Sequence, residues 1–121
     1  MNRFKNWKQP KMKHGKPTKW NWVPYYPENI SIGYKSDIGA FCLLFAHEKI
    51  HIGWGVQIGA RTTIYTKNTE NCTHGKVIIK RGAKIGAHCI IFPNVIIEKE
   101  EKIPAKSIVY INKDNERVIK R

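Results

Sequence analysis

Two histidines and a glutamate lie close together in the stretch LLFAHEKIHIGWG, residues 43–55. An imidazole with a pKa near neutrality can act as a general base toward a hydroxyl or an amine. A carboxylate beside it can fix its tautomer and stabilise the imidazolium. We therefore take His47, followed by Glu48, as the first candidate catalytic pair. The alternative is a solvated turn that happens to contain charged residues.

Metal binding is a second interpretation of the same histidines. A zinc site needs three or four ligands that converge at about 2.1 Å. His47 and His51 are four residues apart, a spacing that suits a helix and not a strand. No similar pair of histidines follows, and we predict no metal site.

A second set of polar residues lies in TKNTENCTHGKV, residues 66–77. His74 is the second candidate base, since a histidine on a long loop could reach a neighbouring cleft. Lys67 and Asn68 are the candidate substrate-binding residues. His88 lies in a regular part of the chain, IGAHC, and we expect it to serve packing or contacts between subunits.

The elements that must position these residues follow a six-residue period. An aliphatic anchor recurs at this step, the residue four positions later is usually small, and glycine directly follows five anchors. Each unit is typical of a short strand and a tight turn, with the anchor inside and glycine accepting the turn dihedrals. The anchors are Ile32, Ile38, Leu44, Ile52, Ile58, Ile64, Ile79, Ile85, Ile91, Ile97, Ile103 and Val109.

Twelve anchors at three per coil predict an all-β fold of about four stacked coils. The period breaks twice, because eight residues separate Leu44 from Ile52 and fifteen separate Ile64 from Ile79. Both breaks follow the third anchor of a coil, so the two insertions should leave the fold at the same corner. The first insertion contains the histidine–glutamate pair and the second contains His74. Sites commonly lie on such outgrowths from a rigid scaffold.

At this point the sequence resembles the hexapeptide-repeat acyltransferases, in the segments IGYKSDIGAFC, VQIGARTTIYT and GKVIIKRGAKIGAHCIIFPNVII. The resemblance covers about residues 30–114 and implies a left-handed parallel β-helix. The handedness comes from the resemblance alone, since the general rule for crossovers favours the right-handed form. The resemblance also implies a homotrimer, with a loop that covers a cleft between neighbouring subunits.

The resemblance further implies an acyltransferase that moves an acyl group from acyl-CoA, with acetyl-CoA as the expected donor. The acceptor would be the oxygen or nitrogen of a sugar or nucleotide-sugar in surface glycan biosynthesis. His47 would be the base and Glu48 would orient it, since His-Glu before Ile-Gly resembles sugar N-acetyltransferases. The residues that would contact acetyl-CoA are Gly86, Ala87, Ala105 and Lys106.

Two alternative functions stay open. One is a non-catalytic trimeric β-helix scaffold that binds anionic partners, and the other is a metal-dependent β-helix enzyme of the carbonic-anhydrase type. The formal net charge of +13 favours anionic partners in general.

The N-terminal segment, residues 1–29, contains seven Lys or Arg and one acidic residue. Its prolines and lysines argue against a packed domain, and its aromatic residues argue against a free tail. We predict a basic arm whose WNWVPYYP part caps the first coil. We favour this interpretation over the alternative that the arm binds single-stranded nucleic acid. The β-helix domain should span 30–114, with a loop protruding at about 66–77, and 115–121 should form a short tail.

The three cysteines, Cys42, Cys72 and Cys89, are odd in number and show no paired spacing, so we predict no disulfide framework. The start of the chain, MNRFKNWK, is basic, but no apolar stretch of a secretory signal follows. The longest apolar runs are too short to span a bilayer. We expect a reduced, cytoplasmic protein without membrane insertion.

Overall fold

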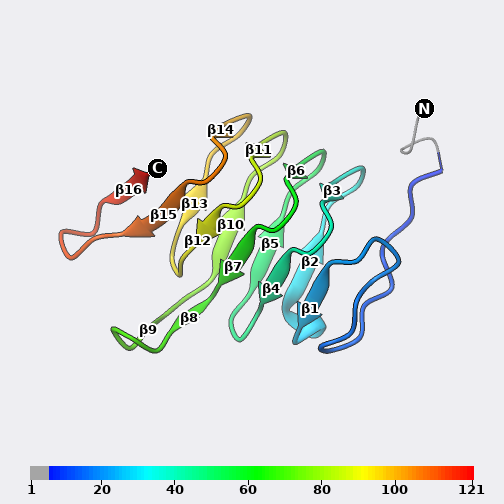
Figure 1. Ribbon diagram of the computed structural model, residues 1–121, viewed down its shortest axis with the longest axis horizontal. Helices are drawn as coiled ribbons and strands as arrows, with labels where there is room; N and C mark the ends of the chain where they lie inside the picture. Colours follow the sequence, from blue (N-terminus) through cyan, green and yellow to red (C-terminus); the bar gives the residue numbers. More distant parts are fainter. Residues whose placement is uncertain (1–5) are drawn as a thin grey trace.

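The computed structural model describes residues 6–121, which form a parallel β-helix of four coils with one short 3₁₀ helix, η1 (Pro27–Asn29) (Figure 1). Each coil contributes one strand to each of three sheets, and these strands pair in parallel with those of the next coil. The predicted all-β fold of about four coils is confirmed. The handedness implied by the resemblance stays a prediction.

The three sheets are called sheet 1, which has the most strands, sheet 2 and sheet 3. Within each coil the chain passes through sheet 2, then sheet 3, then sheet 1. Sheet 1 contains β1 (Val23–Tyr25), β4 (Leu43–Phe45), β7 (Thr63–Tyr65), β12 (Ile90–Ile91), β15 (Ile108–Ile111) and β16 (Arg117–Lys120). Sheet 2 contains β2 (Ile30–Ile32), β5 (Ile50–Ile52), β10 (Val77–Ile79) and β13 (Ile96–Ile97). Sheet 3 contains β3 (Asp37–Ile38), β6 (Gln57–Ile58), β11 (Lys84–Ile85) and β14 (Lys102–Ile103).

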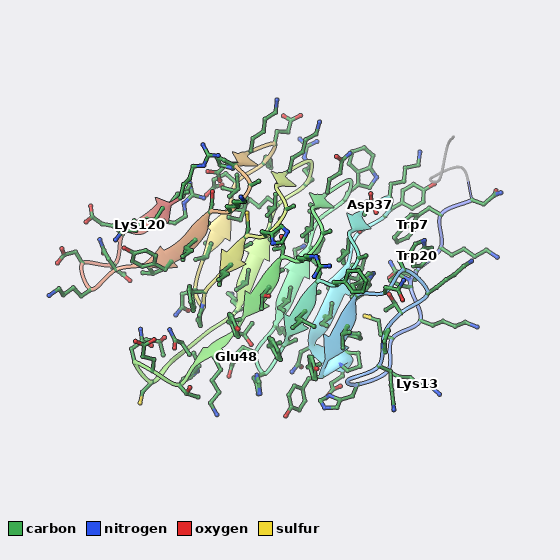
Figure 2. All side chains as sticks on the ribbon, in the orientation of Figure 1. Trp7, Lys13, Trp20, Asp37, Glu48 and Lys120 are labelled. Carbon is green, nitrogen blue, oxygen red and sulfur yellow. The ribbon has the colours of Figure 1, made fainter. Side chains whose placement is uncertain are left out.

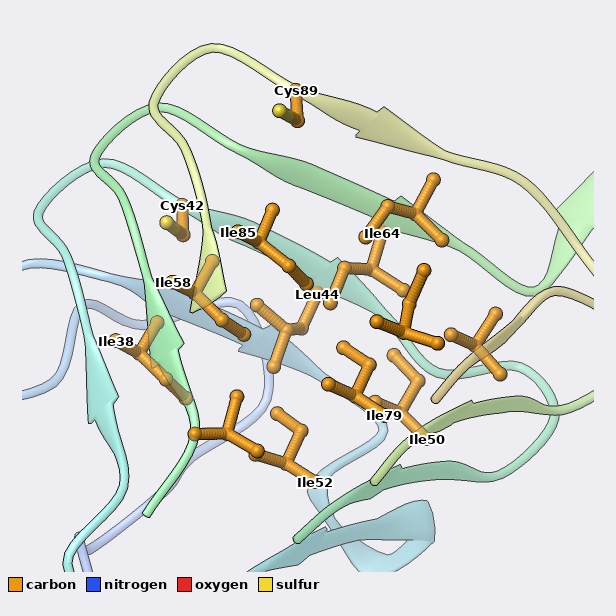
Figure 3. Close-up of a cluster of buried hydrophobic side chains, with 14 of the residues drawn as sticks. Ile38, Cys42, Leu44, Ile50, Ile52, Ile58, Ile64, Ile79, Ile85 and Cys89 are labelled. Carbon is orange, nitrogen blue, oxygen red and sulfur yellow. The ribbon is translucent and has the colours of Figure 1, made fainter. Parts of the chain in front are cut away.

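The predicted anchors fill the interior of the helix. All twelve are buried, and they stack on one another because paired strands are in register, as with Leu44 opposite Ile64 (Figure 3). The small residues predicted four positions later are buried at the corners. They include Cys42 and Thr62, which donate hydrogen bonds to the carbonyl oxygens of Gly59 and Gly86 in the following coil. The hexad pattern therefore describes both the core and its corners.

The role predicted for the glycines that follow the anchors is wrong. The positive-φ glycines are Gly15, Gly55 and Gly82, and none of these directly follows an anchor. The glycine after an anchor is required for a different reason, which Gly59 illustrates. A Cβ on this residue would lie 2.4 Å from the backbone nitrogen of Ala87 in the next coil, so any side chain would hold the coils apart.

Both ends of the chain differ from the expectation, and residues 1–5 of the predicted arm lie outside the described residues. Strand β1 pairs in parallel with β4, so the sheet begins before residue 30. Trp22 is buried in the same cluster as the anchors, and Trp7 packs against that cluster. Figure 2 shows Trp7 and Trp20 beside each other at this end of the helix. At the other end, the expected tail 115–121 includes β16, which folds back antiparallel to β15.

The cysteines are all free thiols: Cys42 and Cys89 are buried and Cys72 is exposed. Burial raises the pKa of Cys42 to about 11 and also raises the pKa of Cys89. Among residues 6–121, no helix has the length and apolar character needed to cross a membrane.

The close approach at Gly59 gives a stability prediction. Gly59→Ala should lower the free energy of unfolding by about 1–3 kcal/mol, because the new methyl group overlaps backbone that cannot move alone. Chemical denaturation measures the change. Gly55→Asn is the matched control: Gly55 has open space around its Cβ position and a φ of +66°, which asparagine tolerates. Equal stability of Gly59→Ala and wild type would contradict the steric explanation.

The ion pair that holds β16 gives a pH prediction. Arg117 binds both carboxylate oxygens of Glu101 and also donates to the carbonyl oxygen of Ile96 at 2.9 Å. The hydrogen bond from Arg117 lowers the pKa of Glu101. The pair therefore stabilises the fold fully above about pH 5, the upper end of an ordinary glutamate titration. This stabilisation is lost as the pH falls through the lowered pKa.

The measurement is the difference in Tm between wild type and Glu101→Gln across the pH range. We expect the full difference near neutrality and its loss in acid. A difference that is the same at all pH values would show that Glu101 stabilises the fold by packing and not by charge. The exposed neighbour Glu100 provides the control variant Glu100→Gln.

Candidate active site

The two insertions leave the helix at the same corner, as predicted. This corner joins sheet 1 to sheet 2 and is called here the loop corner. The first insertion is the turn 46–49 between β4 and β5, and the second is 66–76 between β7 and β10. The second contains a small antiparallel hairpin of β8 (Lys67–Asn68) and β9 (Thr73–His74). The hairpin projects from the coils in Figure 1.

Thr66 is the residue that joins the two insertions. Its side chain is fully buried, and its Oγ1 donates to the carbonyl oxygen of Phe45 at 2.7 Å and accepts from the backbone N–H of Glu48 at 2.9 Å. The carbonyl oxygen of Thr66 accepts from the N–H of Gly75 at 2.9 Å. One buried threonine therefore holds Glu48 in the first insertion and the base of the hairpin in the second.

Asn94, from the third coil, holds the hairpin from its other side. Its Nδ2 donates to the carbonyl oxygen of His74 at 3.3 Å, and its backbone N–H donates to the carbonyl oxygen of Lys76 at 3.1 Å. Gly75 makes this contact possible, since a Cβ there would lie 1.9 Å from Oδ1 of Asn94. The position of His74 is thus fixed by both neighbouring coils.

These supports bring together two of the predicted catalytic residues. Nδ1 of His74 lies 3.5 Å from Oε2 of Glu48, with side-chain exposures of 70% and 47%. Figure 2 shows Glu48 near the base of the hairpin. An exposed pair of this kind contributes little to stability. Its geometry, however, is that of an imidazole with a carboxylate that can orient it and stabilise its protonated form.

The histidine in contact with Glu48 differs from the one that adjacency in the sequence suggested. His47 is exposed, and its ring lies against Tyr26 with 4.7 Å between ring centroids. Asn29 also donates to the carbonyl oxygens of Ala46 and His47. The turn thus directs His47 toward the segment before β2, whereas Glu48 faces the hairpin.

The two predicted substrate-binding residues lie on opposite faces of the hairpin. Lys67 is the cross-strand partner of His74, and Asn68 is the partner of Thr73. Since neighbouring residues of a strand point to opposite faces, Lys67 shares a face with His74 and Asn68 does not.

The predicted acyl-donor residues lie together at a different corner, which joins sheet 3 to sheet 1 and is called here the small-residue corner. The backbone N–H of Lys106 donates to the carbonyl oxygen of Ala87 at 2.9 Å. A Cβ on Gly86 would lie 2.5 Å from the nitrogen of Ala105, so the two coils touch through backbone alone. Such a corner leaves backbone accessible to a ligand, and the exposed Lys106 adds a positive charge beside it.

A stack of aromatic rings beside the loop corner was not anticipated. Tyr25, Phe45, Tyr65 and Phe92 follow one another along sheet 1, with centroid distances of 4.7, 5.2 and 5.6 Å and interplanar angles of 15° or less. Alignment of the coils could have predicted it, since three of these residues directly follow the third anchor of their coil. The stack stiffens the edge from which both insertions leave.

Residues 6–121 contain no group of three or more His, Cys, Asp or Glu side chains that could hold a metal ion. Among the predicted residues, the Glu48–His74 pair is therefore the best candidate for a catalytic site, and Lys67 lies on the same face of the hairpin.

The fold is a parallel β-helix built on a six-residue period, and the solved structures that resemble it include acyltransferases. A hexapeptide-repeat-containing acetyltransferase from Vibrio cholerae O1 biovar eltor, complexed with acetyl coenzyme A, matches with a TM-score of 0.61. The identity is 19%, over 83% of this chain and 63% of that chain. At this identity the match shows the fold alone.

AntD, an N-acyltransferase from Bacillus cereus, is more similar in sequence. A single-residue mutant of AntD, in complex with dTDP and coenzyme A, is 29% identical to this chain, with a TM-score of 0.55, over 76% of this chain and 68% of that chain. A second mutant of AntD, in complex with dTDP-4-amino-4,6-dideoxyglucose and coenzyme A, is 28% identical, with a TM-score of 0.54, over 75% of this chain and 67% of that chain. A scan against models of protein families gave no match, and neither did a search of curated proteins.

The part of Thr66 in positioning the pair can be tested with Thr66→Val, which keeps the volume and removes the hydroxyl. The buried N–H of Glu48 would lose its partner, and the carbonyl of Phe45 would keep only the backbone N–H of Thr66 as a donor, so we expect a loss of about 1–3 kcal/mol in stability. We also expect the NMR signals of the His74 ring to shift as Glu48 moves.

The matched control is Thr62→Val. Thr62 is equally buried and donates to the carbonyl of Gly86 at the small-residue corner. It should lose similar stability without a change at His74. If Thr66→Val leaves the His74 signals where they are, Thr66 does not position the pair.

Proposed function

We propose that this protein is an acyltransferase that moves an acyl group from acyl-CoA, with acetyl-CoA as the expected donor, to an oxygen or nitrogen of a sugar or nucleotide-sugar. The observation that carries the proposal is the contact between Glu48 and His74, which two separate insertions bring to one corner. The similarity to AntD, crystallised with coenzyme A and a dTDP-linked amino sugar, supports these substrate classes. Cytoplasmic surface-glycan biosynthesis is the setting that we propose.

In the proposed reaction, His74 takes the proton of the acceptor hydroxyl or amine as that oxygen or nitrogen attacks the thioester carbonyl carbon. Glu48 orients the imidazole through Nδ1 and stabilises it when it is protonated. The C–S bond then breaks, and the imidazolium returns its proton to the departing thiolate. The products are an ester or amide and the CoA thiol, so the step needs no further reactant.

Other residues of the loop corner would serve the acceptor and the transition state. Lys67 lies on the hairpin face of His74, where its ammonium group can neutralise a phosphate of a nucleotide-sugar. Backbone N–H groups near the long loop would stabilise the oxyanion that forms during attack. His47, the first choice from the sequence, would line the acceptor side of the corner.

The small-residue corner fits the acyl donor. Gly86, Ala87 and Ala105 present backbone with little side-chain bulk, which lets an extended pantetheine chain approach. Lys106 is exposed beside them and can pair with a phosphate as a point charge.

Completion of the site would require a second copy of the chain. Within one protomer the small-residue corner precedes the strands of sheet 1 and the loop corner follows them, so sheet 1 separates the two groups. We propose that a neighbouring protomer in a homotrimer brings its small-residue corner to the loop corner. The outer face of sheet 1, with Leu43, Ile90 and Ile108, supplies apolar surface for such contacts.

Acyl transfer by histidine variants tests the proposed base. The assay follows thiol release from acetyl-CoA with nucleotide-linked amino sugars as acceptors. His74→Ala should reduce the rate about 10²–10⁴-fold, as expected for loss of a general base, and Glu48→Gln should reduce it in the same direction. The control is His51→Ala, since His51 is exposed on the outer face of sheet 2.

Two outcomes would contradict this assignment. Full activity in both His47→Ala and His74→Ala would show that neither histidine of this corner acts as the general base. Absence of CoA binding in calorimetry at about millimolar CoA, where a weak site is still detectable, would favour a scaffold that binds anionic partners.

A further inference from the structure

A groove of about 570 Å³ lies between the β8–β9 hairpin and the turn that joins β15 to β16. Both of these elements project from the same side of the helix in Figure 1. The groove is called here the asparagine groove. Its lining residues are Asn68, Glu70, Asn71, Thr73, Phe92, Pro93, Asn94, Tyr110, Ile111, Asn112 and Asn115.

The amide groups of the groove are held in place by their own turns. Oδ1 of Asn68 accepts from the N–H of Glu70 at 3.1 Å, and Oδ1 of Asn71 accepts from the N–H and Oγ1 of Thr73 at 3.2 and 2.6 Å. Oδ1 of Asn112 accepts from two backbone N–H groups of its turn, each at 2.9 Å. Asn71 and Asn112 thereby fill both acceptor sites of their amide oxygens, and Nδ2 of Asn112 also donates to Oε1 of Glu116 at 3.4 Å. Since an asparagine side chain has two N–H donors, each amide keeps at least one donor for a ligand while its plane is fixed.

Two aromatic rings, those of Phe92 and Tyr110, line the groove. Phe92 is the last ring of the stack along sheet 1 among the described residues. Tyr110 follows it in register on the next coil, since Ile91 pairs with Val109, and both rings are half-buried. Apolar rings with a few placed polar groups are the usual composition of a small-molecule site.

The charges of the residues that line the groove indicate which class of ligand it could bind. The chain contains 22 Lys and Arg residues, yet the groove is lined by none of them and by one carboxylate, that of Glu70. A site for a phosphate or a nucleotide would be expected to recruit basic side chains, which this surface has in excess elsewhere. A neutral ligand with many hydroxyl groups and one apolar face matches the amides and the rings.

We propose that the asparagine groove binds a neutral sugar ring, which packs on Phe92 and Tyr110 and exchanges hydrogen bonds with the asparagine amides. The groove lies on the Asn68 face of the hairpin, opposite the face of Lys67 and His74. It would therefore hold a sugar unit that is not the one being acylated. The proposal does not depend on acyl transfer, because sugar binding is measured without an acyl donor.

The test is an NMR titration of the full chain with neutral methyl glycosides of glucose, galactose and N-acetylglucosamine, and with glucose 1-phosphate as a charged comparison. At least one neutral glycoside should bind with a Kd of about millimolar and shift the side-chain amide signals of Asn68, Asn71 and Asn112. Tyr110→Leu and Asn68→Ala should each weaken that binding at least about 10-fold, the effect of losing about 1.4 kcal/mol.

Thr69→Ala is the matched control, since Thr69 is exposed in the turn of the same hairpin and does not line the groove. Its sugar affinity should equal that of wild type. Backbone spectra of each variant establish that it is folded. The proposal is overturned if no neutral glycoside shifts the groove signals, if only glucose 1-phosphate does so, or if both groove variants, shown to be folded, bind as wild type does.

Discussion

The structure depends on one steric constraint: neighbouring coils touch through backbone at the corners. At Gly59 and Gly86 the next coil is so close that a methyl group would overlap it. This contact sets the spacing of the coils and places each anchor on the one before it. Register is strongly specified in such a stack, because a shift of one residue would turn every anchor outward.

From this constraint follows the position of the candidate site. Because the coils are in register, extra residues can leave only at a corner, and both insertions leave at the one after sheet 1. Thr66 and Asn94 then use hydrogen bonds to neighbouring coils to fix the hairpin, and Glu48 meets His74. The scaffold is rigid, and the chemistry lies on the part that the repeat does not govern.

Much of the fold could be predicted from the sequence, since the period reports the interior directly. The anchors, the small corner residues and the shared corner of the insertions all follow from counting residues between aliphatic positions. The role of glycine could not be read in this way, because both a turn and a close approach favour that residue. The return strand β16 is also not predicted from the sequence, although the β-branched Val118 and Ile119 after the polar turn NKDN are a hairpin signal.

The site was predictable as a location but not as a set of contacts. The sequence places His47 beside Glu48, but the direction of each side chain depends on the turn, which Tyr26 and Asn29 contact from the segment before β2. The asparagine groove is formed by three segments that meet only after folding, among them the turn before β16. The spacing of residues along the sequence does not show which distant segments come into contact in the folded chain.

The central claim is that the loop corner, built around Glu48 and His74, receives an acyl thioester. A crystal structure of the full chain grown with coenzyme A tests it most directly. We expect the CoA sulfur to lie within about 3.5 Å, directly or through one water, of an imidazole of the loop corner, with Lys106 of a neighbouring copy near a phosphate. Coenzyme A bound away from the loop corner, or crystals that contain none, would contradict the claim.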